Sequence, residues 1–369
     1  FILVFLLILN IALPSCSMED DIEKNSPGGS GYKIYSLLEE EENRPVKGGT
    51  FKLFSTNPDT LNPLLTKNSF VRRFSSFVYE SLVRIGPDQK PEPMLAESWD
   101  VSENGLIYTF HIREGVEWHN GSVLTSWDVE YTFKTIMENS NSVYRANLEN
   151  VATYAAVNRR DFKVVLKKPY SFTPELLTFP IIPANLPASA YDPEGGQNIL
   201  PAGTGPYRYS EVEKGKFINL KANDSWWNSG TDSENSISTP YISEVRINIY
   251  NDPNDEIGAF QSGSVDAVYI ESLDYSKYNA RSDIKIDEFC GRNFDFLAFN
   301  LSRPVSGDKK ARKAIAYAVD RNTIVREILY NRGRISDLPL NPDSWLYPVD
   351  SFTYTYDPEQ AVKILEEDG

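Results

Sequence analysis

The sequence predicts an α/β fold with more than one domain, and three observations support this. The chain has 369 residues, of which 41% are hydrophobic and 12% aromatic, which is enough for two or three hydrophobic cores. Segments with the period-two alternation of strands are interspersed with segments of helical spacing. Residues 245–269 have the pattern of strand, helix and strand, which predicts parallel strands joined by a right-handed crossover.

The first folded element is expected at residues 48–54, a short strand followed by a turn-rich segment over residues 55–63. A helix is predicted over residues 70–83, where apolar and mostly aromatic residues recur at helical spacing. Such a stripe is typical of a helix face that packs into a core. Its members are Phe70, Phe74, Phe77, Val78 and Leu82.

Residues 91–133 contain the clearest local pattern in the chain. Apolar residues alternate with polar ones over residues 106–112, which predicts a half-buried strand. After a turn at residues 119–121, Thr125 and Asp128 stand at the positions of an N-terminal capping pair, so a helix is expected to continue through Ile136. A strand over residues 162–166 and a short helix over 172–179 follow. The prolines of residues 180–187 then indicate a domain boundary.

The second half of the chain begins with a glycine-rich turn at residues 203–205. Further strands are predicted near residues 207–209, 217–220, 245–250, 265–269 and 294–301, and helices over residues 254–263, 308–328 and 357–365. The long helix over 308–328 contains Asp320, Arg321 and Asn322, which are expected to break it into two.

The N-terminal residues indicate export. Residues 1–16 are an apolar run of the length of a signal-peptide core, and Leu13-Pro14-Ser15-Cys16 is similar to a bacterial lipobox, in which Cys16 is diacylated. We interpret them as an N-terminally incomplete signal peptide with a lipobox, with an ordinary signal peptide and an incidental cysteine as the alternative. Residues 17–46 read as a disordered acidic tether. Cys290, which has no second structural cysteine to pair with, is expected to be a small buried residue.

Composition and motifs exclude several classes of function. The formal charge is 37 minus 52, or −15, with no basic cluster, so we expect no nucleic-acid partner. His111 and His119 have no metal-ligand spacing, and Gly203–Gly205 is too short for a dinucleotide fingerprint, so no metal and no cofactor are predicted. Carboxylates are plentiful, which leaves an extracytoplasmic hydrolase as an alternative, but no acidic pair stands out. The prediction is a binding protein, not an enzyme.

Several motifs, in a fixed order, carry a resemblance to a known family. They are PDTLNP at residues 58–63, VYESLV at 78–83, the PEPMLAESWD segment starting at 91, GTGPYRY at 203–209, KANDSWW at 221–227, FQSGSVDAVYI at 260–270, FDFLAFNLSRP at 294–304, KKARKAIAYAVDRNTIVREI at 309–328 and DPEQAVKILEEDG at 357–369. Together they resemble the family 5 extracellular solute-binding proteins, the peptide- and oligopeptide-binding lipoproteins of ABC importers.

The resemblance implies a two-lobed α/β fold of the periplasmic-binding-protein type, a class II Venus flytrap, with an extra α+β domain. It implies that residues 47–80 and 188–290 form lobe I, that residues 81–187 form the extra domain packed on lobe I, and that residues 291–369 form part of lobe II, which is expected to be truncated at the C-terminus.

The function that the resemblance implies is capture of peptides in a cleft between the lobes and delivery to the transmembrane subunits of an ABC permease. The protein is expected to be a monomer, extracytoplasmic and lipid-anchored to the outer face of the bacterial cell membrane, or periplasmic. Alternative ligands of the same fold are a nickel chelate, haem or an oligosaccharide. A peptide sensor or adhesin is an alternative of another class, beside the hydrolase.

The resemblance also implies ligand-binding residues. An extended segment beside the bound peptide corresponds to Thr66, Lys67, Asn68 and Ser69, although family members often have an acidic residue in place of Lys67. Tyr144 corresponds to an aromatic residue that reaches the cleft from the extra domain. The cleft wall and hinge correspond to Tyr269, Asn293, Phe294 and Asp295.

Overall fold

The computed structural model describes residues 46–194, 199–229, 240–270, 274–288, 294–348, 350 and 352–366. The chain divides into two compact units. One comprises residues 1–83 and 93–268, and the other residues 84–92 and 269–369. Among the described residues, we find no helix with the length and apolarity needed to cross a bilayer. Cys16, Cys290 and nearly all of the predicted signal peptide and tether lie outside the described residues.

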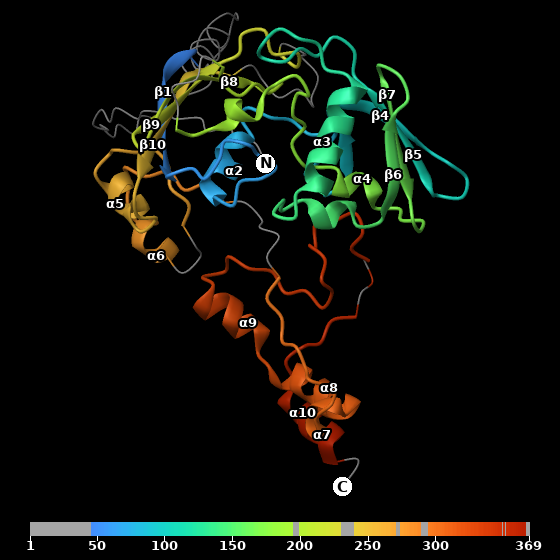
Figure 1. Ribbon diagram of the computed structural model, residues 1–369. Helices are drawn as coiled ribbons and strands as arrows, with labels where there is room; N and C mark the ends of the chain where they lie inside the picture. The colour runs from blue at the N-terminus through green and yellow to red at the C-terminus, as the bar shows by residue number, and fades with distance from the viewer. Residues whose placement is uncertain are drawn as a thin grey trace, which may run out of the picture. The chain divides into compact units, whose positions relative to one another are not determined.

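The first unit contains a four-stranded mixed sheet (Figure 1). In spatial order, its strands are β1 (Gly48–Thr56), β10 (Ile242–Tyr250), β9 (Phe217–Ala222) and β8 (Tyr207–Glu213). β1 and β10 are parallel, and the other pairs are antiparallel. The sequence predicted all four strands, so the α/β character of this unit is confirmed.

The strand predicted over residues 265–269 is wrong, and with it the strand–helix–strand unit. After β10 comes α5 (Asp255–Gln261), but the following residues join the edge of β1 only through Asp266. The Asp266 N–H donates to the Lys52 carbonyl (2.9 Å), and the Asp266 carboxylate accepts from the Lys52 N–H (2.7 Å). Because a side chain supplies the second bond, no strand ladder continues from this point. The parallel partner of β10 is therefore the N-terminal strand β1.

The second sheet of this unit is antiparallel, with the order β4 (Ala96–Val101), β5 (Ile107–Ile112), β7 (Asp161–Leu166) and β6 (Val151–Ala156). Helix α3 (Ser126–Glu138) packs on the β6 and β7 side. Thr125 and Asp128 form the predicted capping box, and Asp128 also accepts from the Ala184 N–H at 2.9 Å. The predictions for β5, α3 and β7 are confirmed, whereas β4 and β6 were not predicted.

Helix α2 (Ser69–Ser75) is shorter than predicted, because the chain turns away after Ser75. The carbonyl oxygens of Phe77 and Val78 accept from the N–H groups of Tyr207 (3.0 Å) and Gly205 (2.9 Å). These bonds use carbonyls that a longer helix would need for itself. α2 lies between the two sheets (Figure 1), and its Val71 and Phe74 belong to the core shared by both sheets.

The glycine-rich turn at residues 203–205 packs directly on this stretch of backbone. A Cβ on Gly203 would overlap the carbonyl oxygen of Val78, and one on Gly205 would lie 2.7 Å from the carbonyl oxygen of Phe77. His119 holds the turn from the other side. Its Nδ1 accepts from the Gly203 N–H (3.1 Å), and its Nε2–H donates to the Gly205 carbonyl (2.9 Å). The turn therefore serves backbone packing.

A buried carboxylate lies beside the same turn. Glu80 is 5% exposed, and its carboxylate oxygens accept from the hydroxyl of Thr204 (2.7 Å) and from the indole N–H groups of Trp226 (3.1 Å) and Trp227 (2.7 Å). Burial raises the pKa of Glu80 to about 7, against the lowering effect of these hydrogen bonds. Three motifs noted in the sequence, VYESLV, GTGPYRY and KANDSWW, thus meet at one carboxyl group.

The regular secondary structure of the second unit that lies beyond residue 268 is helical in its described part. The predicted helix over residues 308–328 is broken, as expected, into α8 (Lys309–Ala318), α9 (Arg321–Thr323) and the π-helical turn η4 (Ile324–Ile328), because Asp320 caps α9 by accepting from the Thr323 N–H at 3.0 Å. α10 (Pro358–Glu366) packs against α8 and confirms the last predicted helix. Residues 294–301 are not a strand, which corrects that prediction.

Short elements complete the described chain. They are β2 (Val83–Ile85) and β3 (Pro91–Pro93), which form a two-stranded sheet, the 3-10 turns η1 (Arg145–Leu148) and η2 (Ala188–Tyr191), and the single-turn helices α4 (Thr173–Leu176), α6 (Tyr275–Tyr278) and α7 (Pro304–Gly307). α4 confirms the helix predicted over residues 172–179, in a shorter form.

Replacing Gly203 by alanine should destabilise the protein, because the added methyl group meets the backbone of Val78. We expect a loss of about 1–3 kcal/mol in the free energy of unfolding, the usual range for overpacking. Gly258→Ala in α5 is the matched control, since nothing lies within 4 Å of its Cβ position. Urea denaturation measures both variants, and equal stability of the two would contradict the packing described here.

The chain has two histidines, which should titrate far apart. Burial lowers the pKa of His119 to about 4. Hydrogen bonds that the His111 ring donates to the carboxylates of Asp100 and Asp161 raise the pKa of His111 above its usual 6.5. The contribution of His111 to stability is therefore complete below pH 6.5 and is lost as pH rises through the folded-state pKa. Imidazole NMR titration measures both, and His111→Gln assigns the signals. Two midpoints near 6.5 would contradict this prediction.

Candidate functional site

The predicted segment Thr66–Ser69 is held in place by Asp59. The Asp59 carboxylate accepts from the hydroxyl of Thr66 and from the N–H of Lys67, the latter at 2.7 Å. Burial alone would raise the pKa of Asp59, but the hydrogen bonds from Thr66, Lys67 and Thr60 outweigh burial and lower it. The side chain of Thr66 is buried, whereas those of Lys67 and Ser69 are exposed. One carboxylate therefore fixes the path of this backbone.

Asn68 has a structural role in the same segment. Its side-chain oxygen accepts from the N–H groups of Phe70 (2.9 Å) and Val71 (3.4 Å) and caps α2. Its amide nitrogen donates to the hydroxyl of Thr56 at 3.0 Å and to the carbonyl of Asn57 at 3.1 Å. With both ends of the amide engaged, Asn68 orients its neighbours, and its side chain has little capacity left for a ligand.

Tyr144 lies close to this segment through Ser142. The buried hydroxyl of Ser142 donates to the Leu64 carbonyl (2.8 Å) and accepts from the Tyr144 N–H (3.4 Å). The Tyr144 ring is half-buried and packs on Phe179 with 5.9 Å between ring centroids. The structure therefore brings together two parts of the predicted site that are more than 70 residues apart in sequence.

Arg72 is a further polar group at this surface that the sequence did not single out. Its Nη1 donates to the Thr66 carbonyl at 3.2 Å. Burial raises the pKa of Tyr144, and the nearby positive charge of Arg72 opposes that effect. Arg72 follows Asn68 by four residues and therefore lies one helical turn along α2 from it. This spacing is the sequence feature that could have indicated Arg72 as a site residue. A fixed guanidinium beside Thr66 and Tyr144 can pair with a carboxylate or a carbonyl oxygen.

This surface combines a backbone segment fixed by Asp59, a half-buried phenol ring and a guanidinium group. Ser69, which was predicted as part of an extended segment, is the first residue of helix α2. We refer to Thr66–Ser69, Arg72 and Tyr144 as the Thr66 surface. Within the described residues, no hydrogen bond reaches the Lys67 carbonyl. A main-chain carbonyl that can accept from a ligand is suited to binding peptides irrespective of their side chains. Among the described residues, we find no cluster of His, Cys, Asp or Glu that could hold a metal ion.

The remaining predicted site residues belong to the second unit or lie outside the described residues. Tyr269 is 43% exposed, and Asp295 is also exposed. Phe294 stacks on Phe296 with 5.9 Å between ring centroids. Asn293 lies outside the described residues. The structure does not place these residues relative to the Thr66 surface, so their role stays a prediction.

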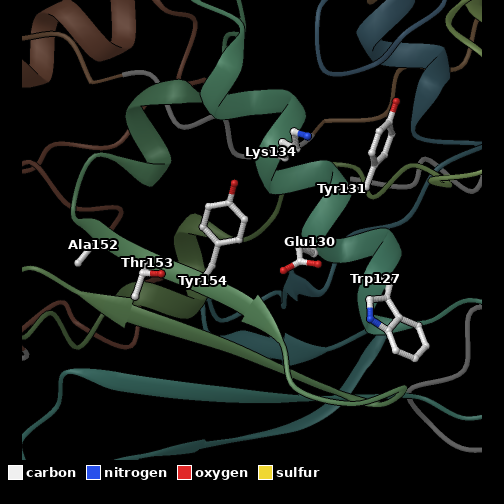
Figure 2. Close-up of a pocket in the computed structure, with 7 residues that line it drawn as sticks. All are labelled: Trp127, Glu130, Tyr131, Lys134, Ala152, Thr153 and Tyr154. Atoms are coloured by element: carbon white, nitrogen blue, oxygen red, sulfur yellow. The ribbon is translucent and has the colours of Figure 1, made fainter.

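A groove that the sequence did not predict lies between α3 and β6, with a volume of about 500 Å³ (Figure 2). Its lining comprises Trp127, Glu130, Tyr131, Lys134, Ala152, Thr153 and Tyr154. None of these belongs to the predicted ligand-binding set, so the groove is a second candidate surface in the first unit.

Comparison with known proteins links these features to one family. The family model for the bacterial extracellular solute-binding proteins, family 5 (middle region), matches residues 90–369. The oligopeptide-binding protein AppA of Bacillus subtilis is 24% identical over 99% of this chain and 65% of its own length. The dipeptide-binding protein of Escherichia coli is 28% identical over 85% of this chain and 62% of its own. The chain thus spans less than two thirds of the length of either relative.

A solved structure shows the same fold. NikZ from Campylobacter jejuni, crystallised with Ni(L-His), superposes with a TM-score of 0.61 at 26% identity, covering 87% of this chain and 63% of that one. The predicted two-lobed α/β fold class is therefore confirmed.

Replacing Asp59 by asparagine should loosen the Thr66 surface, because the amide replaces one hydrogen-bond acceptor with a donor. We expect the Lys67 amide to exchange with solvent about tenfold faster, in line with the loss of one charge-assisted hydrogen bond of roughly 1.5 kcal/mol. Hydrogen exchange followed by NMR measures this. Asp100→Asn, which removes an exposed carboxylate outside the Thr66 surface, is the control, and an equal effect there would contradict the role of Asp59.

Proposed function

Because this chain belongs to the family 5 bacterial extracellular solute-binding proteins, we propose that it is the substrate-binding lipoprotein of an ABC importer. It captures peptides in a cleft between two lobes and delivers them to the transmembrane subunits of a permease. Binding is non-covalent, and closure about a hinge presents the loaded form to the membrane. The relatives named for oligopeptide and dipeptide binding support a peptide as the ligand.

The observation that carries the peptide proposal is the Thr66 surface. Asp59 fixes the backbone at Thr66 and Lys67, so the ordering cost of presenting the Lys67 carbonyl is met before the ligand arrives. Main-chain pairing is independent of the peptide's side chains. Tyr144 provides ring area with few rotatable bonds. Arg72 supplies a positive charge for a carboxylate or carbonyl oxygen of the ligand.

The proposed domain organisation follows the same family pattern. Residues 47–80 and 188–290 form lobe I, residues 81–187 form the extra domain, and residues 291–369 contribute to lobe II. The two separate four-stranded sheets of the first unit support a boundary between lobe I and the extra domain. Tyr269 and Asn293–Asp295 line the hinge and cleft wall in this proposal, and diacylated Cys16 anchors the chain to the outer face of the membrane.

Native mass spectrometry of the full-length, delipidated protein, purified from its host, tests the ligand class. A distribution of co-purified peptide masses is the expected result. A single discrete nickel or haem adduct, or one oligosaccharide mass, would show that the ligand is that compound and not a peptide. Turnover of added peptides or glycans would instead establish a hydrolase and overturn the proposal.

Replacing Tyr144 by alanine should weaken peptide binding about tenfold, the usual effect of removing an aromatic residue from an interface. Isothermal titration calorimetry of the full-length protein with a peptide identified by mass spectrometry measures the loss. Tyr241→Ala is the matched control, because Tyr241 is 39% exposed and lies outside the Thr66 surface. Unchanged affinity of the Tyr144 variant would remove Tyr144 from the site.

A further inference from the structure

The groove between α3 and β6 lies along a strand edge that pairs with no other strand of the described residues. β6 is the last strand of its sheet. Across the hairpin to β7, the Val157 N–H donates to the Asp161 carbonyl at 2.8 Å. Because N–H groups alternate in direction along a strand, those of Ala156 and Tyr154 point away from β7, toward the groove. An edge of this kind is a template for an added strand.

Only part of this edge is blocked by the protein itself. Glu130 on α3 accepts from the Ala156 N–H at 3.3 Å, and Figure 2 shows its carboxylate directed from the helix toward β6. The main-chain N–H and C=O of Tyr154 share the outward direction of Ala156, and Tyr154 lines the groove. An extended segment lying between α3 and β6 can therefore pair with Tyr154 and continue toward Ala152.

The charges and rings of the groove favour a cationic side chain. Glu130 and Glu138 stand about two turns apart on α3 and reinforce the effect of burial in raising the pKa of Tyr154. Lys134 lines the groove and lies 3.9 Å from Glu138, its ion-pair partner, so Glu130 supplies the carboxylate of the groove lining. Trp127 is 51% exposed at the groove, and an indole face attracts a guanidinium or ammonium group.

We propose that this groove binds an extended peptide segment of a partner protein, which adds a strand to β6 and places a Lys or Arg side chain between Glu130 and Trp127. Main-chain hydrogen bonds to Tyr154 set the direction of the segment, and the carboxylate and indole select the basic residue. The groove shares no residue with the Thr66 surface, so variants can be made at one surface without altering the residues of the other.

The probe is the fluorescein-labelled, amide-capped peptide Thr-Val-Arg-Val-Thr, titrated with the full chain and followed by fluorescence anisotropy. Trp127→Ala should weaken binding about tenfold, as for an aromatic anchor, and Glu130→Gln about threefold, as for a part-exposed ion pair. Glutamine keeps an acceptor for the Ala156 N–H, so the variant isolates the charge. Glu103→Gln, in an exposed turn outside the groove, removes the same charge and should bind normally.

A second probe tests strand pairing directly. The same peptide, N-methylated at alternate residues, keeps its arginine but loses main-chain donors, and its affinity should fall about tenfold through the loss of one or two hydrogen bonds. Equal binding of both peptides would overturn the proposal. So would binding that Tyr144→Ala weakens and Trp127→Ala does not, which would place the peptide at the Thr66 surface. Concentration-dependent dimerisation without peptide binding would assign the edge to a second copy of the chain.

Discussion

The first unit depends on the close approach of the glycine turn at residues 203–205 to the backbone of Phe77 and Val78. Without side chains at Gly203 and Gly205, the two backbones come near enough for direct hydrogen bonds. Glu80, two residues beyond Val78, then reaches Thr204 and both indoles of Trp226 and Trp227. Chain segments about 125 and 147 residues apart are fixed by one buried carboxyl group.

The contact of the glycine turn with the backbone of Phe77 and Val78, which we call the junction, also determines where the Thr66 surface lies. Because the carbonyls of Phe77 and Val78 are used by the glycine turn, α2 ends early and stays a short, capped helix in the shared core. Its first turn is fixed by Asn68, and the segment before it by Asp59. The surface is therefore anchored at both ends to the rigid part of the unit, which suits a wall of a binding site.

Local patterns in the sequence predicted local structure well. β5 and α3 were predictable because alternation and the Thr125–Asp128 capping box act over a few residues. Contacts distant in sequence decide the other features, which are the length of α2, the edge strand β6 and the conformation of residues 265–269. Examples are the contact of Gly205 with Val78 and that of Lys52 with Asp266. For the same reason Thr66–Ser69 was predicted only through family resemblance, whereas Asp59 and Arg72, which act through contacts, were missed.

The junction also combines two groups whose titrations oppose each other. Glu80 keeps its proton up to about pH 7 instead of its ordinary 4.5, so its folded state binds the extra proton and stability falls as pH rises across that window. His119 stays neutral down to about pH 4 instead of 6.5, so the unfolded state binds the extra proton and stability falls as pH drops across that window. Between pH 4.5 and 6.5 the changes of stability with pH that the two groups cause have opposite signs. Glu80 and His119 hold the same turn, so their pH dependences oppose each other at one place in the fold.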